Sequence, residues 1–146
     1  MKAVYERAVC YYETDRMGIV HHSNYIRWYE EARVHYMVRI GVPYDELEKR
    51  GILIPVLSVS SEYRKPFMFG DTFLVELTCD SFNGIKCSFE YNVINKATGE
   101  LCNTGTSRHC FLRKAPESPD GEWDMRPVNI KREYPEIYEK MLKGVG

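Results

Sequence analysis

Two runs of alternating apolar and polar residues, joined by the dipeptide Asn83-Gly84, constrain the fold of this chain most strongly. Residues 73–79 and 85–93 place an apolar side chain at every second position. Because successive side chains of a strand point to opposite faces, these runs predict two half-buried strands. Asn-Gly between them predicts a tight hairpin in which both turn residues have positive φ. A second turn containing Gly99 leads into a further predicted strand, residues 101–112.

An earlier segment has the period of a helix. Its apolar face consists of residues spaced by four, three and four positions, namely Tyr25, Tyr29, Ala32 and Tyr36. This spacing places the four side chains on one side of a helix that we expect to end near Ile40. Ser23 or Asn24 is the predicted cap, because their side-chain oxygens accept hydrogen bonds from the amides of a first helical turn.

The remaining segments complete an α+β pattern. Residues 3–12 and 52–64 predict strands, Pro43 and Gly51 bound a short helix, and residues 136–143 predict a closing helix after a turn-rich stretch that follows Pro116. Helices near the start and hairpin-linked strands after them predict an antiparallel sheet with the long helix on one face. We expect one domain over residues 1–146. The predicted core contacts join two sets of residues, Tyr29, Ala32 and Tyr36 with Val75, Leu77, Phe89 and Tyr91.

Composition excludes several classes of protein. The formal net charge is −1, from 20 basic and 21 acidic residues, so there is no basic excess for a nucleic-acid partner. No stretch reaches the ~20 apolar residues of a membrane span, and we expect a cytoplasmic protein because no secretory signal is visible. The five cysteines form no Cys-x-x-Cys pair, which favours buried thiols in a reducing compartment over zinc or disulfides.

The densest group of reactive side chains lies in residues 15–25, between the first strand and the long helix. Asp15 could attack a carbonyl or activate water, His21 or His22 could orient a substrate or move a proton, and the helix N-terminus could stabilise an oxyanion. The residues alone also allow a simpler interpretation. Asp15 would then bond its own loop, the histidines would lie at the surface and Tyr25 would belong to the core.

The segment YYETDRMGIVHHSNYIRWYEEAR, residues 11–33, resembles the signature of the 4-hydroxybenzoyl-CoA thioesterase family. It is most similar to the branch that includes the enzyme encoded beside the Tol–Pal envelope system. Further matches extend the resemblance over about residues 4–113, among them Gly41, Tyr44, Gly51-Ile52, Pro55-Val56, Lys65-Pro66 and Gly70-Asp71. The resemblance implies the hotdog fold, in which an antiparallel sheet wraps around a long central helix.

The same resemblance implies a function and roles for individual residues. The chain would hydrolyse an acyl-CoA to a free acid and CoA, with no metal and no cofactor, as a homodimer or homotetramer. Asp15 would be the nucleophile or general base, His22 would position substrate or assist proton transfer, and Gly18 would let the loop turn. The backbone of Ser23, Asn24 and Tyr25 would polarise the thioester carbonyl. His21 departs from the family pattern, where an aromatic residue, usually Tyr, is common.

Several alternatives remain open from the sequence. Glu30 or Glu31 could supply the carboxylate, as a helical Glu does in another hotdog branch, and His109-Cys110 could suggest a thiol nucleophile. Candidates for binding the CoA phosphates are basic residues near predicted strand ends or turns, Arg64, Lys65 and Lys86 first, then Arg108 and Lys114. The alternative functions are a non-catalytic acyl-CoA-binding protein and a hotdog hydratase or dehydratase.

Overall fold

The computed structural model describes residues 1–114 and 126–146, and a five-stranded antiparallel sheet is its largest element. The strand order across this sheet is β1-β4-β5-β6-β3. Its strands are β1 (Lys2–Ala8), β4 (Thr72–Phe82), β5 (Lys86–Asn95), β6 (Leu101–Cys110) and β3 (Val56–Tyr63). A smaller sheet contains β2 (Ile52–Leu53), β7 (Leu112–Arg113) and β8 (Arg126–Pro127). The turn-rich stretch expected after Pro116 falls largely outside the described residues.

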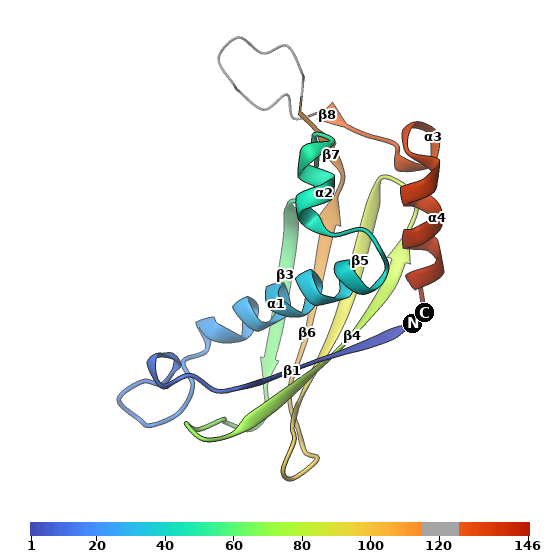
Figure 1. Ribbon diagram of the computed structural model, residues 1–146. Helices are drawn as coiled ribbons and strands as arrows, with labels where there is room; N and C mark the ends of the chain where they lie inside the picture. Colours follow the sequence, from blue (N-terminus) through green and yellow to red (C-terminus); the bar gives the residue numbers. More distant parts are fainter. Residues whose placement is uncertain (115–125) are drawn as a thin grey trace.

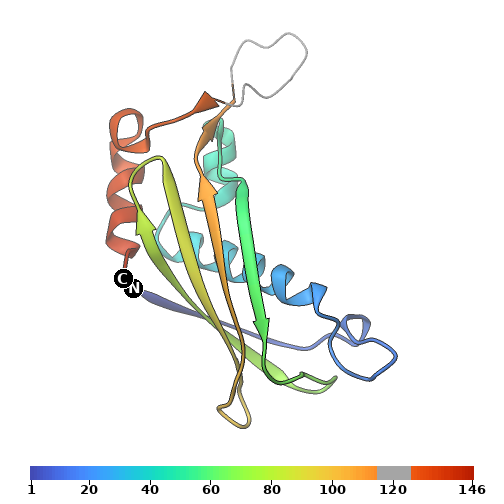
Figure 2. The same cartoon turned by 180° about the vertical axis from the view of Figure 1, so that it is seen from behind.

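The long helix α1 (Ser23–Arg39) lies along one face of the large sheet (Figures 1 and 2). The Trp28 ring stacks on Phe73 with centroids 3.8 Å apart. The predicted core is confirmed, since its seven residues are all fully buried: Tyr29, Ala32, Tyr36, Val75, Leu77, Phe89 and Tyr91. The apolar face of α1 therefore packs on the apolar face of the strands, as predicted. The helix lies between the sheet and solvent.

Three shorter helices cover the end of the sheet remote from the start of α1 (Figure 1). They are α2 (Tyr44–Lys49), α3 (Ile130–Glu133) and α4 (Pro135–Gly144). The predicted helices near Pro43 and at 136–143 are confirmed as α2 and α4. The sequence analysis did not predict α3 or β8, which are only four and two residues long.

Three predicted strands are shorter or interrupted in the structure, and the one expected over residues 101–112 breaks at Phe111 into β6 and β7. The first ends at Ala8, and a 3-10 turn, η1 (Tyr11–Glu13), follows where the strand was expected to continue. Residues 52–64 form two strands, β2 and β3, separated at Ile54 and Pro55. Pro55 has no N–H to donate, so an unbroken ladder through this position would lose a hydrogen bond.

The hairpin between β4 and β5 is confirmed, but its predicted turn conformation is wrong. Only Gly84 has positive φ, 93°, whereas Asn83 does not. The Asn83 side chain instead accepts hydrogen bonds from the amides of Ile85 at 2.9 Å and Lys86 at 2.8 Å. These two hydrogen bonds from the backbone to the Asn83 side chain stabilise the turn, so a second residue with positive φ is not needed.

The predicted cap of α1 is also wrong. His22 is the N-cap residue, and Ser23 and Asn24 lie inside the first turn. His21 takes over the capping role, since its Nδ1 accepts the Ser23 amide at 3.2 Å and its carbonyl oxygen accepts the Asn24 amide at 3.0 Å. An imidazole acceptor is rare enough at this position that residue preferences pointed to Ser or Asn instead.

The start of α1 and the loop before it extend past the edge of the large sheet. Both views show this segment beyond β3, the edge strand, rather than over the centre of the sheet (Figures 1 and 2). No helix in the described part of the chain is long and apolar enough to cross a membrane.

Candidate functional site

Asp15 lies in a closed loop between η1 and α1. Its amide donates to the Ile19 carbonyl oxygen at 2.9 Å, and its own carbonyl oxygen accepts the Gly18 amide at 3.0 Å. Gly18 has φ of 79°, a conformation that favours glycine and lets the chain reverse here. The Asp15 carboxylate oxygen Oδ1 accepts the Met17 amide at 2.8 Å. The loop therefore orients this half-buried carboxylate through backbone contacts.

A pocket of about 360 Å³ lies beside this loop. It brings together side chains from the loop, the start of α1 and the end of β3: Asp15, His22, Tyr25, Tyr63, Arg64 and Lys65. A carboxylate, an imidazole and two cations thus share one cavity with aromatic walls. Gly18, Ser23 and Asn24 lie nearby in the chain but do not line it.

The rings of the two histidines lie against one another, with centroids 4.1 Å apart and an angle of 34° between their planes. The Nδ1 atom of His21 lies 2.8 Å from the Ser23 hydroxyl, so the His21 ring is hydrogen-bonded to the first residue of α1. His22 lines the pocket, and its carbonyl oxygen accepts the Tyr63 hydroxyl at 2.9 Å. Of the two histidines, His22 lines the pocket that contains Asp15, and His21 does not.

The amides at the start of α1 differ in their availability. His21 accepts the amides of Ser23 and Asn24, as described above. Among the described residues the amide of Tyr25 has no backbone acceptor. The carbonyl oxygen of His22 accepts the Tyr63 hydroxyl. Of the three amides expected to polarise a carbonyl, that of Tyr25 is the one left for a ligand.

The Tyr25 side chain belongs to an aromatic cluster. Its ring centroid lies 4.7 Å from Trp28 and 5.0 Å from Tyr63, and only 3% of the residue is exposed. Burial raises the pKa of its hydroxyl, so it stays neutral. Tyr25 is therefore a core residue that also forms part of the pocket wall.

Only two of the three main candidates for phosphate binding reach this pocket. The backbone amides of Arg64 and Lys65 both donate to Cys102 O, at 2.9 and 3.1 Å, which holds the two residues at its mouth. Lys65 forms an ion pair with Glu100. Lys86 pairs with Cys110, whereas Tyr63 pairs with Asn103, so Lys86 lies seven residues along β6, or roughly 23 Å, from the pocket.

The alternative catalytic residues do not line this pocket; they are Glu30, Glu31, His109 and Cys110. Glu31 forms an ion pair with Arg7 at 3.0 Å, as expected for a salt-bridging residue, and exposed Glu30 lines a different cavity. His109 is buried with its Nε2 2.7 Å from the Ser107 hydroxyl, and burial lowers its pKa to about 4. Cys110 is half-buried, and as the next strand residue it points to the opposite face from His109.

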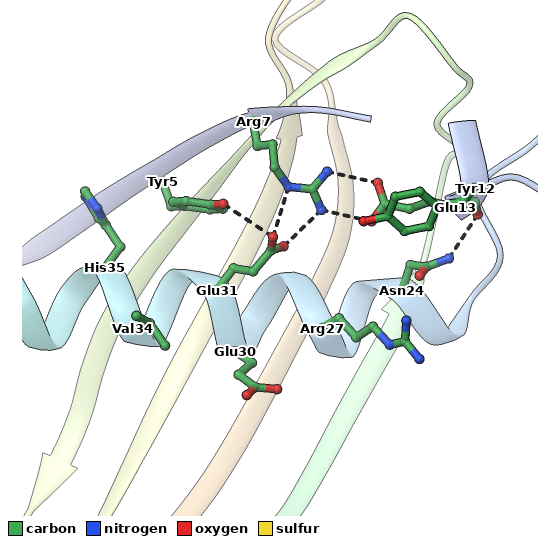
Figure 3. A pocket seen from close by; sticks show the side chains of 10 residues that line it. All are labelled: Tyr5, Arg7, Tyr12, Glu13, Asn24, Arg27, Glu30, Glu31, Val34 and His35. Atoms are coloured by element: carbon green, nitrogen blue, oxygen red, sulfur yellow. Dashed lines mark hydrogen bonds and ion pairs between the residues drawn. The ribbon is translucent and has the colours of Figure 1, made fainter. Parts of the chain in front are cut away.

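A larger cavity of about 660 Å³ lies between β1 and α1 (Figure 3). Its innermost charged groups already neutralise one another, since the Arg7 guanidinium lies between the carboxylates of Glu13 and Glu31. The smaller cavity contains Asp15, His22 and the open Tyr25 amide. We therefore take the smaller one as the candidate site.

Glu13 is a buried residue next to the site that was not predicted from the sequence. It is 2% exposed, and its carboxylate accepts bonds from Arg7, Cys10 and Trp28. Residue spacing within a turn does not show whether a carboxylate is buried or exposed. The partners of Glu13 also come from three separate parts of the chain, so the sequence did not indicate its role. No group of three or more His, Cys, Asp or Glu residues that could hold a metal ion is found among residues 1–114 and 126–146.

Comparison with known proteins adds independent information. A family model described as the thioesterase-like superfamily matches residues 9–133, most of the chain. The Bacillus subtilis protein YneP, provisionally named an acyl-CoA thioesterase, is 35% identical over 141 residues, which cover 94% of this chain and 96% of that protein.

Two solved structures share the fold at recognisable sequence identity. A DHNA-CoA thioesterase from Staphylococcus aureus superposes with a TM-score of 0.87 and 27% identity, over 97% of this chain and 89% of the other. A gentisyl-coenzyme A thioesterase superposes with a TM-score of 0.70 and 25% identity, over 75% and 88%.

Proposed function

Because the chain belongs to the thioesterase-like superfamily, we propose that it is a hydrolase that cleaves acyl-CoA thioesters in the pocket around Asp15. The observation that carries this proposal is that Asp15, His22 and Tyr25 line one cavity at the start of α1, where the Tyr25 amide has no backbone acceptor. The names of YneP and of the two solved structures all describe CoA thioesterases, which supports acyl-CoA as the substrate class.

Two routes lead from this arrangement to the same products. In the first, the Asp15 carboxylate attacks the thioester carbonyl and expels the CoA thiolate, and water then cleaves the resulting anhydride. In the second, Asp15 takes a proton from water, hydroxide adds to the carbonyl, and the thiolate leaves with a proton. Turnover in ¹⁸O-labelled water separates them, since only the first route can place ¹⁸O in the Asp15 side chain.

The start of α1 supplies the second part of the mechanism. Both routes place negative charge on the former carbonyl oxygen, and the Tyr25 amide can donate to it, aided by the positive end of the helix dipole. One such preorganised donor contributes about 3–4 kcal/mol to transition-state stabilisation in other hydrolases. His22 positions the thioester or assists proton transfer from the wall of the same pocket.

The CoA portion of the substrate needs cations at the pocket mouth. Arg64 is the better candidate, because Lys65 is already paired with Glu100. Lys86 would contribute only from another subunit, since it lies at the far end of the strands in this one. No cofactor beyond the substrate's own CoA is required.

We also propose that the chain forms a homodimer or homotetramer through the edge strand β3. Ser61 faces the helix side of the sheet, where its hydroxyl bonds Tyr29 at 2.8 Å. Val59 and Tyr63 point to the same side but remain 38% and 48% exposed. An apolar edge left uncovered by α1 is suited to pairing with a second copy.

The finer family assignment is part of this proposal. We assign the antiparallel sheet with α1 along one face to the hotdog fold that the segment at 11–33 suggests, in a single domain over residues 1–146. The placement within the 4-hydroxybenzoyl-CoA family, in its Tol–Pal-associated branch, rests on that segment alone.

The decisive experiment compares Asp15→Asn with Asp71→Asn. Both aspartates accept a backbone amide within their own loop, Asp71 from Met68 at 2.8 Å, but Asp71 does not line the pocket. Asp15→Asn should lower kcat by at least ~10²-fold on the best substrate of a panel of short, long and aromatic acyl-CoAs, with little change in KM. Asp71→Asn should leave kcat within about twofold of the unmodified protein, since it removes no group that lines the pocket. Full activity of Asp15→Asn would disprove the mechanism, and Glu30 or Glu31 would then be tested.

A further inference from the structure

The buried carboxylate of Glu13 lies two residues before Asp15, and we propose that Glu13 is a positioning residue that sets the Asp15 carboxylate against the start of α1. This inference rests on the proposed function. Glu13 does not line the pocket that contains Asp15, so it acts through its neighbours rather than on the substrate.

Both oxygens of the Glu13 carboxylate are fully used. Oε1 accepts the Cys10 amide at 2.8 Å and Arg7 at 3.0 Å. Oε2 accepts Arg7 at 2.9 Å and the indole N–H of Trp28 at 2.7 Å. One side chain thereby joins β1, the η1 turn and the second turn of α1. Figure 3 shows its contact with Arg7 of β1.

The main chain of Glu13 closes the base of the Asp15 loop. Its carbonyl oxygen accepts the His21 amide at 2.8 Å and the Asn24 side-chain amide at 2.9 Å. The pairing continues upward as a bridge between Thr14 and Val20 and then as the bond from Asp15 N to Ile19 O. The loop is therefore a small hairpin, with Glu13 at its base and Asp15 two residues above it.

Arg7 holds the Glu13 carboxylate from the outer side. Its guanidinium also bonds Glu31 of α1, through Nε and a terminal nitrogen, both at 3.0 Å. Burial acts to raise the pKa of Glu13, but hydrogen bonds from Arg7 and Trp28 outweigh it, so the pKa is lowered and the group is ionised at neutral pH. A carboxylate that is charged at neutral pH is a fixed anchor for four donors.

The anchor matters because it connects the two halves of the site. The Asp15 carboxylate comes from the hairpin, and the Tyr25 amide comes from the first turn of α1. Glu13 contacts both, through His21 on one side and through Asn24 and Trp28 on the other. A displacement of about 1 Å between reacting groups can cost ~10²-fold in rate, so the distance that Glu13 fixes affects turnover.

Glu13→Gln and Glu31→Gln form a matched pair of variants. Both remove one negative charge that bonds Arg7. In Glu13→Gln an NH₂ group replaces one oxygen and faces donors, because every Glu13 partner is an N–H. Glu31 makes no bond to the hairpin base or to Trp28, so Glu31→Gln controls for the charge alone.

We expect Glu13→Gln to lower kcat at least about tenfold while KM changes less than about threefold, and Glu31→Gln to keep kcat within about twofold. Thermal unfolding of both variants establishes that they are folded at the assay temperature. Hydrogen exchange of residues 14–22 should accelerate in Glu13→Gln and not in Glu31→Gln. Equal kcat in the two variants, or unchanged exchange in this segment, would overturn the proposal.

A double variant separates positioning from a general loss of folded protein. If Glu13 acts through Asp15, adding Glu13→Gln to Asp15→Asn should lower the residual activity less than twofold, whereas a merely structural effect lowers it by the same factor in both backgrounds. Full activity of Asp15→Asn alone contradicts the proposed function itself. A strongly impaired Asp15→Asn with the same further factor from Glu13→Gln leaves that function intact and contradicts only the positioning role.

Discussion

The ring of His21 lies against the ring of His22, with centroids 4.1 Å apart, yet the two side chains face different parts of the molecule. His21 Nδ1 accepts the Ser23 amide at the start of α1, whereas His22 lines the pocket beside Asp15. Adjacent histidines of similar appearance in the sequence thus have separate structural settings.

From this difference we expect His22→Ala to affect mainly catalysis and His21→Ala to affect mainly stability. His22→Ala should lower kcat/KM, but by less than the loss in Asp15→Asn, because the carboxylate and the Tyr25 amide remain. His21→Ala should lower the free energy of unfolding by about 1 kcal/mol, as for loss of a helix cap, with a smaller effect on kcat. Steady-state kinetics and urea unfolding of both variants check this, and a reversed pattern would contradict the assignment.

His109 should make the stability of the protein depend on pH. Its pKa is lowered to about 4, by burial first and then by the nearby charge of Arg33, whereas an exposed histidine has a pKa near ~6.5. Between these values the unfolded chain binds a proton that the folded chain does not, so stability is present above ~6.5 and is lost as the pH falls toward 4. The slope from this group is at most about 1.4 kcal/mol per pH unit.

The control for this pH effect is His109→Gln, which can still bond Ser107 but does not titrate. Urea unfolding at pH 7 and pH 5 should show a smaller loss of stability in the variant than in the unmodified protein. Identical losses would show that His109 is not the group responsible.

The proposed interface can be tested with two exposed valines on opposite edges of the sheet. Val59 lies on β3, and Val4 lies on β1, the other edge strand. Val59→Lys should shift the protein toward a monomer in light scattering at micromolar concentration, because it places a charge in the proposed interface. Val4→Lys should leave the oligomer unchanged, and a dimer that survives Val59→Lys would contradict pairing through β3.

Much of the fold was predictable because it depends on periodicity. The spacing from Tyr25 to Tyr36 defined α1 to within a residue at its end, and the alternation around Asn83-Gly84 defined the β4–β5 hairpin. The errors occur where a specific partner overrides a preference. His21 displaces Ser23 and Asn24 as the cap, and η1 replaces the end of the first strand where Glu13 turns inward.

The candidate site was predictable in part. Asp15, His22 and Tyr25 lie in one short segment and line one pocket. Glu13 was not found, because its importance depends on Arg7 and Trp28, which lie on other elements. Lys86 was grouped with Arg64 and Lys65 on charge alone, and charge carries no information about which end of a strand faces the pocket.

The small hairpin that carries Asp15 also bears on how such a protein can change over time. The Asp15 carboxylate is oriented by the backbone amide of Met17, which any residue except proline can supply, and the Met17 side chain is 76% exposed. The Met17 side chain also lines the pocket. Substitutions at this position can therefore alter which acyl groups fit while the reacting groups keep their places, so substrate range and chemistry can evolve separately.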